Sequence, residues 1–322
     1  MAARRSEHVL VEIRDLRRYY GGIRAVDGIS FAIASGTVHG FIGPNGAGKT
    51  TTLRVLATLD VPDGGDILFE GRSLLDYPDE VRPRIGFMPD YLEAYRDITV
   101  EEYLDFYARA YGLAPALRRR RLADVVEFTR LGELLSRPAH ALSKGQKQRL
   151  SLCRVLVSDP MLLILDEPAS GLDPRARIEL RSLIRQLGDG GKAVLFSSHI
   201  LSELAEVCDA VTIIDQGRLC ASDRVSGLQH RVDHGVRVDV ALDSPGEEEK
   251  ARLVRLLAEI PGVLSADSTL HGAWFSYEGE PSARAAILSR LVAGGFRVTD
   301  FGAASSDLED AFMKLTERKT SS

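Results

Sequence analysis

The residues best suited to chemistry form a glycine-rich octapeptide near the start of the chain. In order, they are Gly43, Pro44, Asn45, Gly46, Ala47, Gly48, Lys49 and Thr50. The glycines let the backbone curl so that successive N–H groups point inward, and a helix that starts at the end of such a loop adds its positive dipole end. This phosphate loop predicts a nucleoside triphosphate site, in which Lys49 reaches the β- and γ-phosphates and the Thr50 hydroxyl binds Mg²⁺.

The segments around the phosphate loop are those that must position it. Val38–Ile42 is an apolar run with the length and composition of a buried strand, and a helix-length segment begins at Thr51. Upstream, residues 9–16 alternate apolar and charged side chains in the manner of an edge strand. A flexible surface loop is the alternative interpretation, but the complete octapeptide between a strand and a helix favours the nucleotide site.

Two further apolar strands lead to polar side chains. Residues 161–165 are followed by Asp166 and Glu167, and residues 193–196 lead to His199. Charged residues that follow buried strands belong at the ligand-facing rim of an α/β sheet. A solvated loop start is the alternative for the Asp-Glu pair alone, but beside the phosphate loop the pair favours a catalytic role.

Between the phosphate loop and these strands the pattern becomes helical. Thr99 and Glu102 have the spacing of a capping box, which predicts the start of a helix. A second glycine-containing segment, residues 142–146, precedes a helix expected over about residues 147–158. We therefore predict a helical subdomain over about residues 91–160.

The composition describes an ordinary globular protein, with 44% hydrophobic and 27% charged residues. A chain of 322 residues is long enough for two domains with separate cores. The formal net charge of -5 argues against binding nucleic acid by bulk electrostatics, so we expect no nucleic-acid partner. The basic run at residues 118–121 is interpreted as a solvated helix face.

The cysteines and the apolar stretches bear on location. The three cysteines have no CxxC spacing, so we expect neither a zinc site nor a disulfide framework, and a reducing, cytoplasmic compartment is the simplest inference. The first ten residues carry two arginines without a following apolar region, so we expect no secretory signal. No apolar stretch approaches the roughly 20 residues needed to span a bilayer, so work at a membrane would need a partner that crosses it.

In combination, these motifs resemble the ATP-binding subunit of an ABC transporter over about residues 9–223. The motifs that carry the resemblance are an adenine-stacking aromatic at Tyr20, the Walker A loop at 43–50, the ABC signature at 142–146, the Walker B strand at 162–166, the D-loop at 169–173 and the switch histidine at His199. Their number and their order along the chain make the resemblance specific.

The resemblance implies an α/β fold, namely a P-loop ATPase domain of ABC type with a helical subdomain. It also implies that two such domains face each other head to tail, with each ATP and its Mg²⁺ between one phosphate loop and the opposite signature. Ser143 and the N–H of Gly145 would then bond the γ-phosphate from across the interface. The implied nucleotide contacts are Tyr20, the phosphate loop, Thr51, Ser143, Gly145 and Gln146.

The same resemblance implies roles for the polar residues after the strands. Asp166 would hold Mg²⁺ through a bound water, an acceptor role that suits a hard cation. Glu167 would orient and polarise the attacking water, and His199 would bond the γ-phosphate, because phosphoryl transfer needs positioning and charge stabilisation more than covalent chemistry. We expect metal contacts from Thr50, Asp166 and Asp90.

Two positions depart from the pattern of this family. Lys144 replaces the usual glycine of the signature, which is compatible with the role of the segment if the side chain points outward. Asp90 stands where the family usually has a glutamine that senses Mg²⁺ and the γ-phosphate. Its carboxylate can still accept water or metal, but it adds negative charge and has a shorter reach. We expect ATP binding to survive, but we expect the rate of hydrolysis and its coupling to the membrane partner to be affected. The alternative is that Asp90 is a solvated turn residue after Pro89.

After about residue 224 the composition changes. Strand and helix patterns follow as β-α-β-β-α-β, the split βαβ pattern of ferredoxin-like domains. We therefore expect an ATPase domain over residues 1–224 and a small C-terminal α+β domain over residues 225–322. We expect a last amphipathic helix over residues 308–315 with Ser306 as its cap. Residues 307–312 resemble the tail of ATPase subunits from exporters whose membrane subunit is a separate chain. We interpret this accessory domain as regulatory or dimer-supporting.

The sequence thus predicts an ATPase subunit that dimerises on ATP and drives a separate integral-membrane permease, with export as the favoured direction. It would be cytoplasmic and held on the inner face of the cell membrane through the permease. One alternative is a soluble ABC ATPase of DNA repair or translation, which would carry long coiled-coil insertions or two fused ATPase units. A nucleotide-sensing regulatory subunit with little turnover is another alternative, which Asp90 favours but Glu167 and His199 oppose.

Overall fold

Three buried strands form the centre of the N-terminal part of the chain. They are β3 (Val38–Ile42), β7 (Leu162–Leu165) and β8 (Ala193–Ser198), and every residue in them is buried. β3 pairs in parallel with β8, and β8 pairs in parallel with β7. Continuous burial is expected for parallel strands that are covered on both faces. The predicted strand before the phosphate loop, β3, and the two predicted strands that precede Asp166 and His199 therefore lie together in one sheet.

Three more strands complete this six-stranded sheet: β6 (Ile85–Met88), β9 (Ala210–Asp215) and β10 (Arg218–Arg224). The strand order is β10-β9-β3-β8-β7-β6, and β10, which is antiparallel to β9, is the exception in an otherwise parallel sheet. The carboxyl ends of β3, β6, β7 and β8 consequently lie at one edge of the sheet. Ligands of open α/β sheets bind at this edge.

A second, antiparallel sheet has the order β2-β1-β4-β5. Its strands are β1 (Val9–Tyr20), β2 (Ile23–Ala34), β4 (Gly64–Phe69) and β5 (Arg72–Ser73). β1 pairs with β2 on one side and with β4 on the other, so the expectation of an edge strand at residues 9–16 was wrong. The alternation of apolar and charged residues arises because one face of the sheet packs on the core and the other faces solvent.

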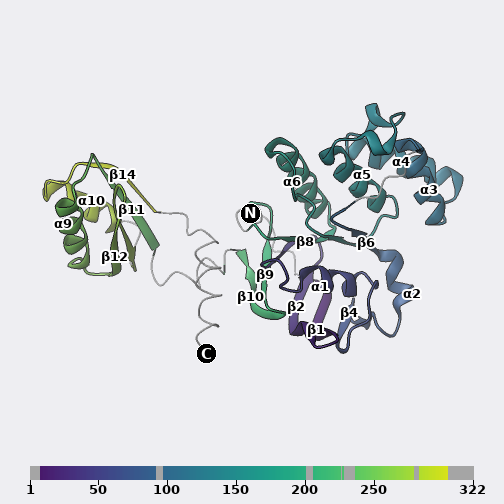
Figure 1. The fold of residues 1–322 in the computed structure, drawn as a ribbon, viewed down its shortest axis with the longest axis horizontal. Helices are drawn as coiled ribbons and strands as arrows, with labels where there is room; N and C mark the ends of the chain where they lie inside the picture. The colour runs from purple at the N-terminus through teal and green to yellow at the C-terminus, as the bar shows by residue number, and fades with distance from the viewer. Residues whose placement is uncertain are drawn as a thin grey trace. The chain divides into compact units, whose positions relative to one another are not determined.

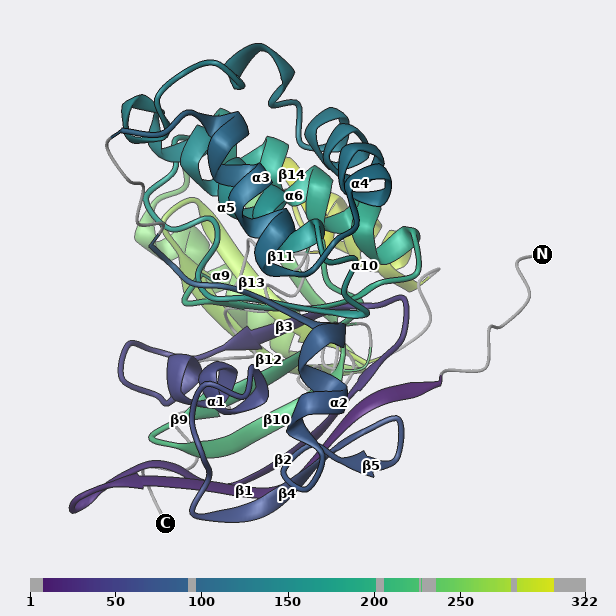
Figure 2. The same ribbon diagram turned by 90° about the vertical axis from the view of Figure 1, so that its right-hand side faces the viewer.

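Helix α1 (Lys49–Leu56) lies between these two sheets. Its buried residues Leu53, Val55 and Leu56 belong to one core cluster with residues of β1, β2, β7 and β8. The views from two directions agree that β1, β2 and β4 lie on one side of the six-stranded sheet and helices α3 to α5 on the other (Figures 1 and 2). The helix after the phosphate loop is thus held by packing on both sides.

The predicted helical subdomain contains α3 (Val100–Ala110), α4 (Pro115–Phe128) and α5 (Lys144–Leu156). The capping box at the start of α3 is confirmed: the Thr99 hydroxyl accepts from the Glu102 N–H, and the Thr99 N–H donates to the Glu102 carboxylate. Helix α5 begins three residues earlier than expected, because its own capping box is built within the signature segment, residues 142–146.

Among the described residues up to 225, the remaining helices are short or lie outside the subdomain. They are α2 (Pro78–Val81), α6 (Pro174–Asp189) and the 3₁₀ turns η1 (Arg82–Arg84), η2 (Gly132–Leu134) and η3 (Ala139–Ala141). Across the part of the chain that the structure describes, no helix combines the length and apolar composition needed to cross a membrane.

The structure is a computed structural model that describes residues 8–91, 97–200, 206–225, 227, 236–278 and 283–303. By its internal contacts the chain divides into two units, Met1–Val225 and Ser226–Ser322. The helix expected over residues 308–315 and its cap at Ser306 lie outside the described residues.

The second unit has one four-stranded antiparallel sheet with two helices on one face. In chain order its elements are β11 (Val236–Leu242), α9 (Glu247–Ala258), β12 (Val263–Thr269), β13 (Gly272–Tyr277), α10 (Ala283–Ala293) and β14 (Val298–Ala303). The strand order β12-β13-β11-β14 places β13 between the two strands that α9 connects, which confirms the predicted ferredoxin-like pattern. Buried residues of α9 and α10, such as Leu253 and Leu291, form the core with Phe275 of the sheet.

Candidate active site

The phosphate loop, residues 43–50, connects β3 to α1 and depends on close backbone approach. A Cβ on Gly43 would overlap the Ile214 carbonyl oxygen, and a Cβ on Gly48 would overlap the Ala25 carbonyl oxygen. Gly48 also has φ of 99°, in the left-handed region, where it caps the start of α1. Only glycine meets both conditions. The loop is therefore packed against two neighbouring segments, with the first turn of α1, including Thr51, directly behind it.

Lys49 is the buried cation of the site. Only 5% of its side chain is exposed, and its Nζ donates to the carbonyl oxygens of Gly43, at 2.9 Å, and Pro44, at 3.3 Å. The same ammonium pairs with Glu167 Oε1 at 3.3 Å. A buried charge needs partners of this kind. Lys49 thus links the phosphate loop to the end of β7.

Asp166 is the buried carboxylate of the site, with 3% exposed. Burial raises the pKa of the Asp166 carboxyl, and hydrogen bonds from Ser197 and Thr50 oppose the rise. The negative charges of Asp90 and Glu167 raise the same pKa further, so both lie near it. The bond from Ser197 Oγ to Asp166 Oδ1 is 2.7 Å long. The structure therefore brings Thr50, Asp90 and Asp166 to one edge of the sheet, and their contact with a metal stays a prediction.

These oxygen donors suit Mg²⁺, which prefers hydroxyl, carboxylate, phosphate and water oxygens. Within the described residues, no group of three or more His, Cys, Asp or Glu side chains is arranged to hold a metal ion. Mg²⁺ usually takes only one or two carboxylates from the protein and completes its shell with water and substrate phosphates. The residues present fit a phosphate-bound Mg²⁺ and not an ion held by protein side chains alone.

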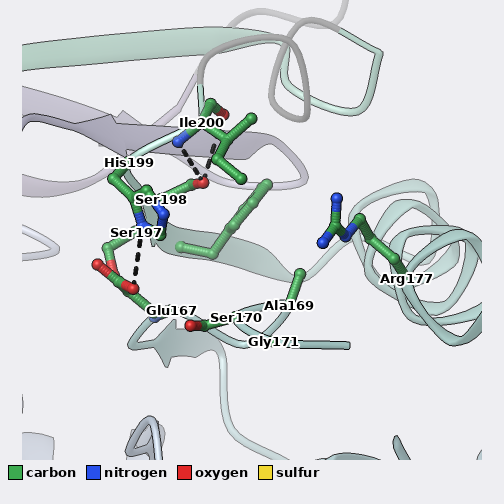
Figure 3. Close-up of a pocket in the computed structure, with 10 residues that line it drawn as sticks. Glu167, Ala169, Ser170, Gly171, Arg177, Ser197, Ser198, His199 and Ile200 are labelled. Atoms are coloured by element: carbon green, nitrogen blue, oxygen red, sulfur yellow. Dashed lines mark hydrogen bonds and ion pairs between the residues drawn. The ribbon is translucent and has the colours of Figure 1, made fainter. Parts of the chain in front are cut away.

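Glu167 and His199 face each other in a cavity of about 90 Å³ (Figure 3). Glu167 Oε2 lies 3.2 Å from His199 Nδ1, and the Glu167 N–H donates to Ser197 Oγ at 2.8 Å. Glu167 has φ of 43°, a strained conformation for a residue with a side chain. This geometry directs its carboxylate toward both Lys49 and His199.

Ser197 is a residue whose role sequence reasoning missed. Its hydroxyl donates to Asp166 and accepts from the N–H of Glu167, so one side chain of β8 orients both acidic residues after β7. The signal was its place two residues before His199 on the neighbouring strand, but pairing of β7 with β8 was needed to interpret it.

The signature segment lines a different cavity, of about 290 Å³. The Ser143 hydroxyl accepts from the Gln146 N–H at 3.3 Å, and the Gln146 side-chain oxygen accepts from the Ser143 N–H at 3.0 Å. Asp173, which caps α6 by accepting from the Ala176 N–H at 2.9 Å, lines the same cavity, as does Gly145. In the described part of one chain, this cavity shares no lining residue with the cavity of Glu167 and His199.

Lys144 and Tyr20 are both held by contacts within the chain. The ammonium of Lys144 lies over Gly171, where a Cβ would overlap it. The Tyr20 hydroxyl donates to the Asp60 carboxylate just after α1, and the Arg18 guanidinium lies 4.5 Å from the centre of the Tyr20 ring. Arg18 thus occupies one face of this ring by a cation–π contact. The role of Tyr20 in stacking adenine stays a prediction.

A family model described as ABC transporter matches residues 26–170 of this chain. The match spans the phosphate loop, the signature segment, Asp166 and Glu167.

Two similar proteins match nearly the whole chain. The Nod factor export ATP-binding protein I of Ralstonia nicotianae is 34% identical over 311 residues, which are 96% of this chain and 94% of that protein. The daunorubicin resistance ATP-binding protein DrrA2 of Streptomyces coeruleorubidus is 35% identical over 311 residues, which are 96% of each chain. The similarity therefore includes the second unit.

Solved structures match about two thirds of the chain. A structure of the ATP-binding subunit of an ABC transporter has 33% sequence identity and a TM-score of 0.62, and the match covers 69% of this chain and 92% of that one. The ADP conformation of an ATP-binding cassette has a TM-score of 0.63 over 69% of this chain and 94% of that one, and its 23% identity shows likeness of fold alone.

Proposed function

The chain belongs to the ABC transporter family of ATP-binding proteins, and on that premise we propose that it is the ATP-hydrolysing subunit of an exporter whose permease is a separate chain. The similarity over 96% of the chain to a protein named for Nod factor export and to one named for daunorubicin resistance carries the proposal of export. The same similarity does not favour a soluble non-transport ATPase or a regulatory subunit.

The nucleotide would lie on the phosphate loop, residues 43–50. Lys49 supports this placement, because its ammonium is held at the loop by two carbonyl oxygens and shares its charge with Glu167. When a triphosphate binds, Lys49 would exchange the Glu167 carboxylate for phosphate oxygens, a charge-assisted bond of the same kind. Tyr20, Thr51 and the remaining residues of the loop would contact the nucleotide as well.

The release of Lys49 would leave Glu167 free to act on water. Its carboxylate is fixed by the Ser197 bond to its N–H and by His199, so it can orient a water for attack in line with the leaving group. His199 would bond the γ-phosphate from its other ring nitrogen. Mg²⁺, when bound, would neutralise phosphate charge. Thr50, Asp90 and Asp166 would hold it.

The signature segment would act on the nucleotide of a second copy of this chain. Its cavity is separate from the cavity of Glu167 and His199, and the start of α5 presents N–H groups and the Ser143 hydroxyl, which suit an anion. Two chains arranged head to tail would therefore close around two ATP molecules, with Ser143, Gly145 and Gln146 completing each site. Such a dimer would transmit closure to a permease that crosses the membrane and would work at its inner face.

Affinity purification of the Glu167→Gln protein from solubilised membranes, with ATP and Mg²⁺, tests this function. We expect an integral-membrane chain to copurify, and the complex to hydrolyse ATP when the wild-type subunit is used. Lys49→Ala is the matched control, because it removes the nucleotide contact. Recovery of the ATPase alone in both samples, from a cell that contains its permease, would contradict the transporter assignment.

A further inference from the structure

Gln148 is a buried polar residue to which the site described above gives no role. It lies on α5, beyond the signature segment, and only 4% of it is exposed. Its Nε2 donates a hydrogen bond to the backbone carbonyl of Asp90 at 3.1 Å. Its Oε1 is buried and has no hydrogen-bond partner among the described residues. Because a buried, half-satisfied amide costs stability, its presence calls for a reason.

The bond from Gln148 joins two parts of the proposed site. Asp90 follows β6, and the last residue of that strand, Met88, accepts from the N–H of Asp166 at 2.8 Å. A second bond from α5, donated by Arg154, reaches the carbonyl of Phe87 at 3.4 Å. The end of β6 is therefore bonded both to α5 and to Asp166, the residue that follows β7.

The hydrogen bond from Gln148 to the backbone of Asp90 matters because the side chain of Asp90 is short. A single carbon separates its backbone from its carboxyl group, so the position of the carboxylate follows the backbone closely. A longer side chain could compensate for a shifted backbone by changing rotamer, and aspartate can do so much less. The Nε2 group of Gln148 therefore bonds to the backbone segment whose position sets the position of the Asp90 carboxylate.

We propose that Gln148 is a positioning residue for Asp90, which holds the Asp90 carboxylate at the Mg²⁺ edge and ties the signature helix of a subunit to the metal site of the same subunit. The inference rests on the proposed function, because it requires Mg²⁺ and ATP at the edge formed by Thr50 and Asp166. Movement of α5 when the signature engages a second chain would then move Asp90 with it.

Mn²⁺ bound with ATP reports on this site without turnover. Mn²⁺ binding to the ATP complex is measured in a Glu167→Gln background from the EPR signal of free Mn²⁺. We expect Gln148→Met to weaken this binding by about three- to tenfold, the range of one hydrogen bond. ATP binding without a divalent cation should be unchanged. Methionine keeps the length and nearly the volume of glutamine, so the packing of α5 should survive. Gln148→Glu, which replaces the donor by an acceptor, should weaken Mn²⁺ binding too and serves if the methionine variant is unstable.

Ser151→Ala is the matched control. Ser151 is fully buried on the same helix, and its hydroxyl also has no hydrogen-bond partner among the described residues. Its removal should leave Mn²⁺ binding unchanged, because the bond to Asp90 stays in place. A double-mutant cycle adds a second control: in an Asp90→Ala background, Gln148→Met should have no further effect on Mn²⁺ affinity.

Retained ATP binding with unchanged Mn²⁺ affinity in Gln148→Met and Gln148→Glu would overturn this inference alone. An equal loss in Ser151→Ala, or in the Asp90→Ala background, would overturn it as well, because the effect would then not act through Asp90. If the parent Glu167→Gln protein binds no ATP, the proposed function fails, and the inference fails with it.

Discussion

The two cavities of the first unit hold their polar groups in different ways. In the cavity of Glu167 and His199, bonds run between elements that are far apart in sequence: Lys49 pairs with Glu167 across the phosphate loop and the end of β7. In the cavity of the signature segment, Ser143 and Gln146 bond to each other within one turn of α5.

This difference shows which part of the site depends on the tertiary fold of its own chain. The pair of Lys49 and Glu167 exists only because β3 and β7 lie in one sheet, with β8 between them. The capping box of α5 needs only its own helix turn, so the segment can be presented to another molecule without losing its internal bonds. On this view the first cavity does chemistry on the nucleotide of its own chain, and the second serves the nucleotide of a partner.

The largest effect is expected from Glu167→Gln. We expect steady-state ATP hydrolysis to fall by about a hundredfold or more, because the carboxylate that would orient the attacking water is lost. ATP binding should be retained or tightened, since the change also removes the carboxylate that pairs with Lys49. Phosphate release and calorimetry measure the two quantities. Glu206→Gln, at an exposed carboxylate paired with Arg181, is the control. Hydrolysis near the wild-type rate would remove Glu167 from this role.

The next effect is the loss of affinity in Lys49→Ala. We expect ATP binding to weaken by about ten- to a hundredfold, the value of one or two hydrogen bonds from a charged donor. Calorimetry with ATP in the absence of hydrolysis measures it. Lys192→Ala is the control, because that ammonium pairs with Asp159 away from the site. Equal affinities in the two variants would argue against a nucleotide on the phosphate loop.

The role of the signature segment in a second chain is tested by mixing variants. Ser143→Ala should lower hydrolysis by about tenfold, with part of the loss arising from a weaker helix cap. An equimolar mixture of Ser143→Ala and Lys49→Ala should regain activity, up to about a quarter of wild type, since half of random dimers contain one intact site.

Thr99→Ala is the matched control for this mixture, because it removes the same kind of cap from α3. It should lower stability by about 1 kcal/mol, and mixing it with Lys49→Ala should follow the sum of the separate activities. A mixture of Ser143→Ala and Lys49→Ala that shows only that sum would mean that the two cavities do not meet across a dimer.

A smaller effect is expected at Asp90, which lies between the two regions. We expect Asp90→Ala to lower hydrolysis by about threefold to tenfold while leaving ATP binding nearly intact. Asp90→Gln should restore or raise the rate, because it keeps an acceptor and removes a negative charge next to Asp166. Hydrolysis is compared with and without the permease. Unchanged rates in both variants under both conditions would identify Asp90 as a solvated turn residue.

The last prediction concerns the pH dependence of stability, which we expect to be absent at neutral pH and to arise from a histidine in the six-stranded sheet. His39 of β3 is buried and bonds to the Thr212 hydroxyl at 2.8 Å, and burial lowers the pKa of its imidazole to about 4. The unfolded chain takes up this proton near pH 6.5 and the folded chain near pH 4. Stability should therefore be unaffected above pH 6.5 and fall by up to about 3 kcal/mol as the pH falls through this window.

Denaturant unfolding between pH 7 and 4 measures this effect. His39→Gln should remove that part of the pH dependence, because glutamine can keep a bond to Thr212 without titrating. His140→Gln, at an exposed histidine, is the control and should leave the dependence as it is. A wild-type pH profile that His39→Gln does not change would contradict the assignment.

The sequence by itself determined the features that depend on short stretches of chain. The phosphate loop was predicted because glycines at fixed offsets and a following helix are local requirements. The Thr99 capping box and the order β-α-β-β-α-β of the second unit were predicted for the same reason: periodicity and capping act within a few residues. The fold class of the first unit followed from the resemblance to ABC ATPases that the motifs and their order carry.

Only the tertiary structure decided which of these elements became neighbours. β1 was expected at an edge, yet it lies between β2 and β4, because alternation reports a half-exposed face and not the number of pairing partners. Ser197 orients Asp166 and Glu167 because β8 pairs with β7, and Gln148 reaches Asp90 because α5 packs beside β6. Such contacts bridge residues that are far apart in sequence, so no local pattern encodes them, and the packing of the sheet sets which side chains meet.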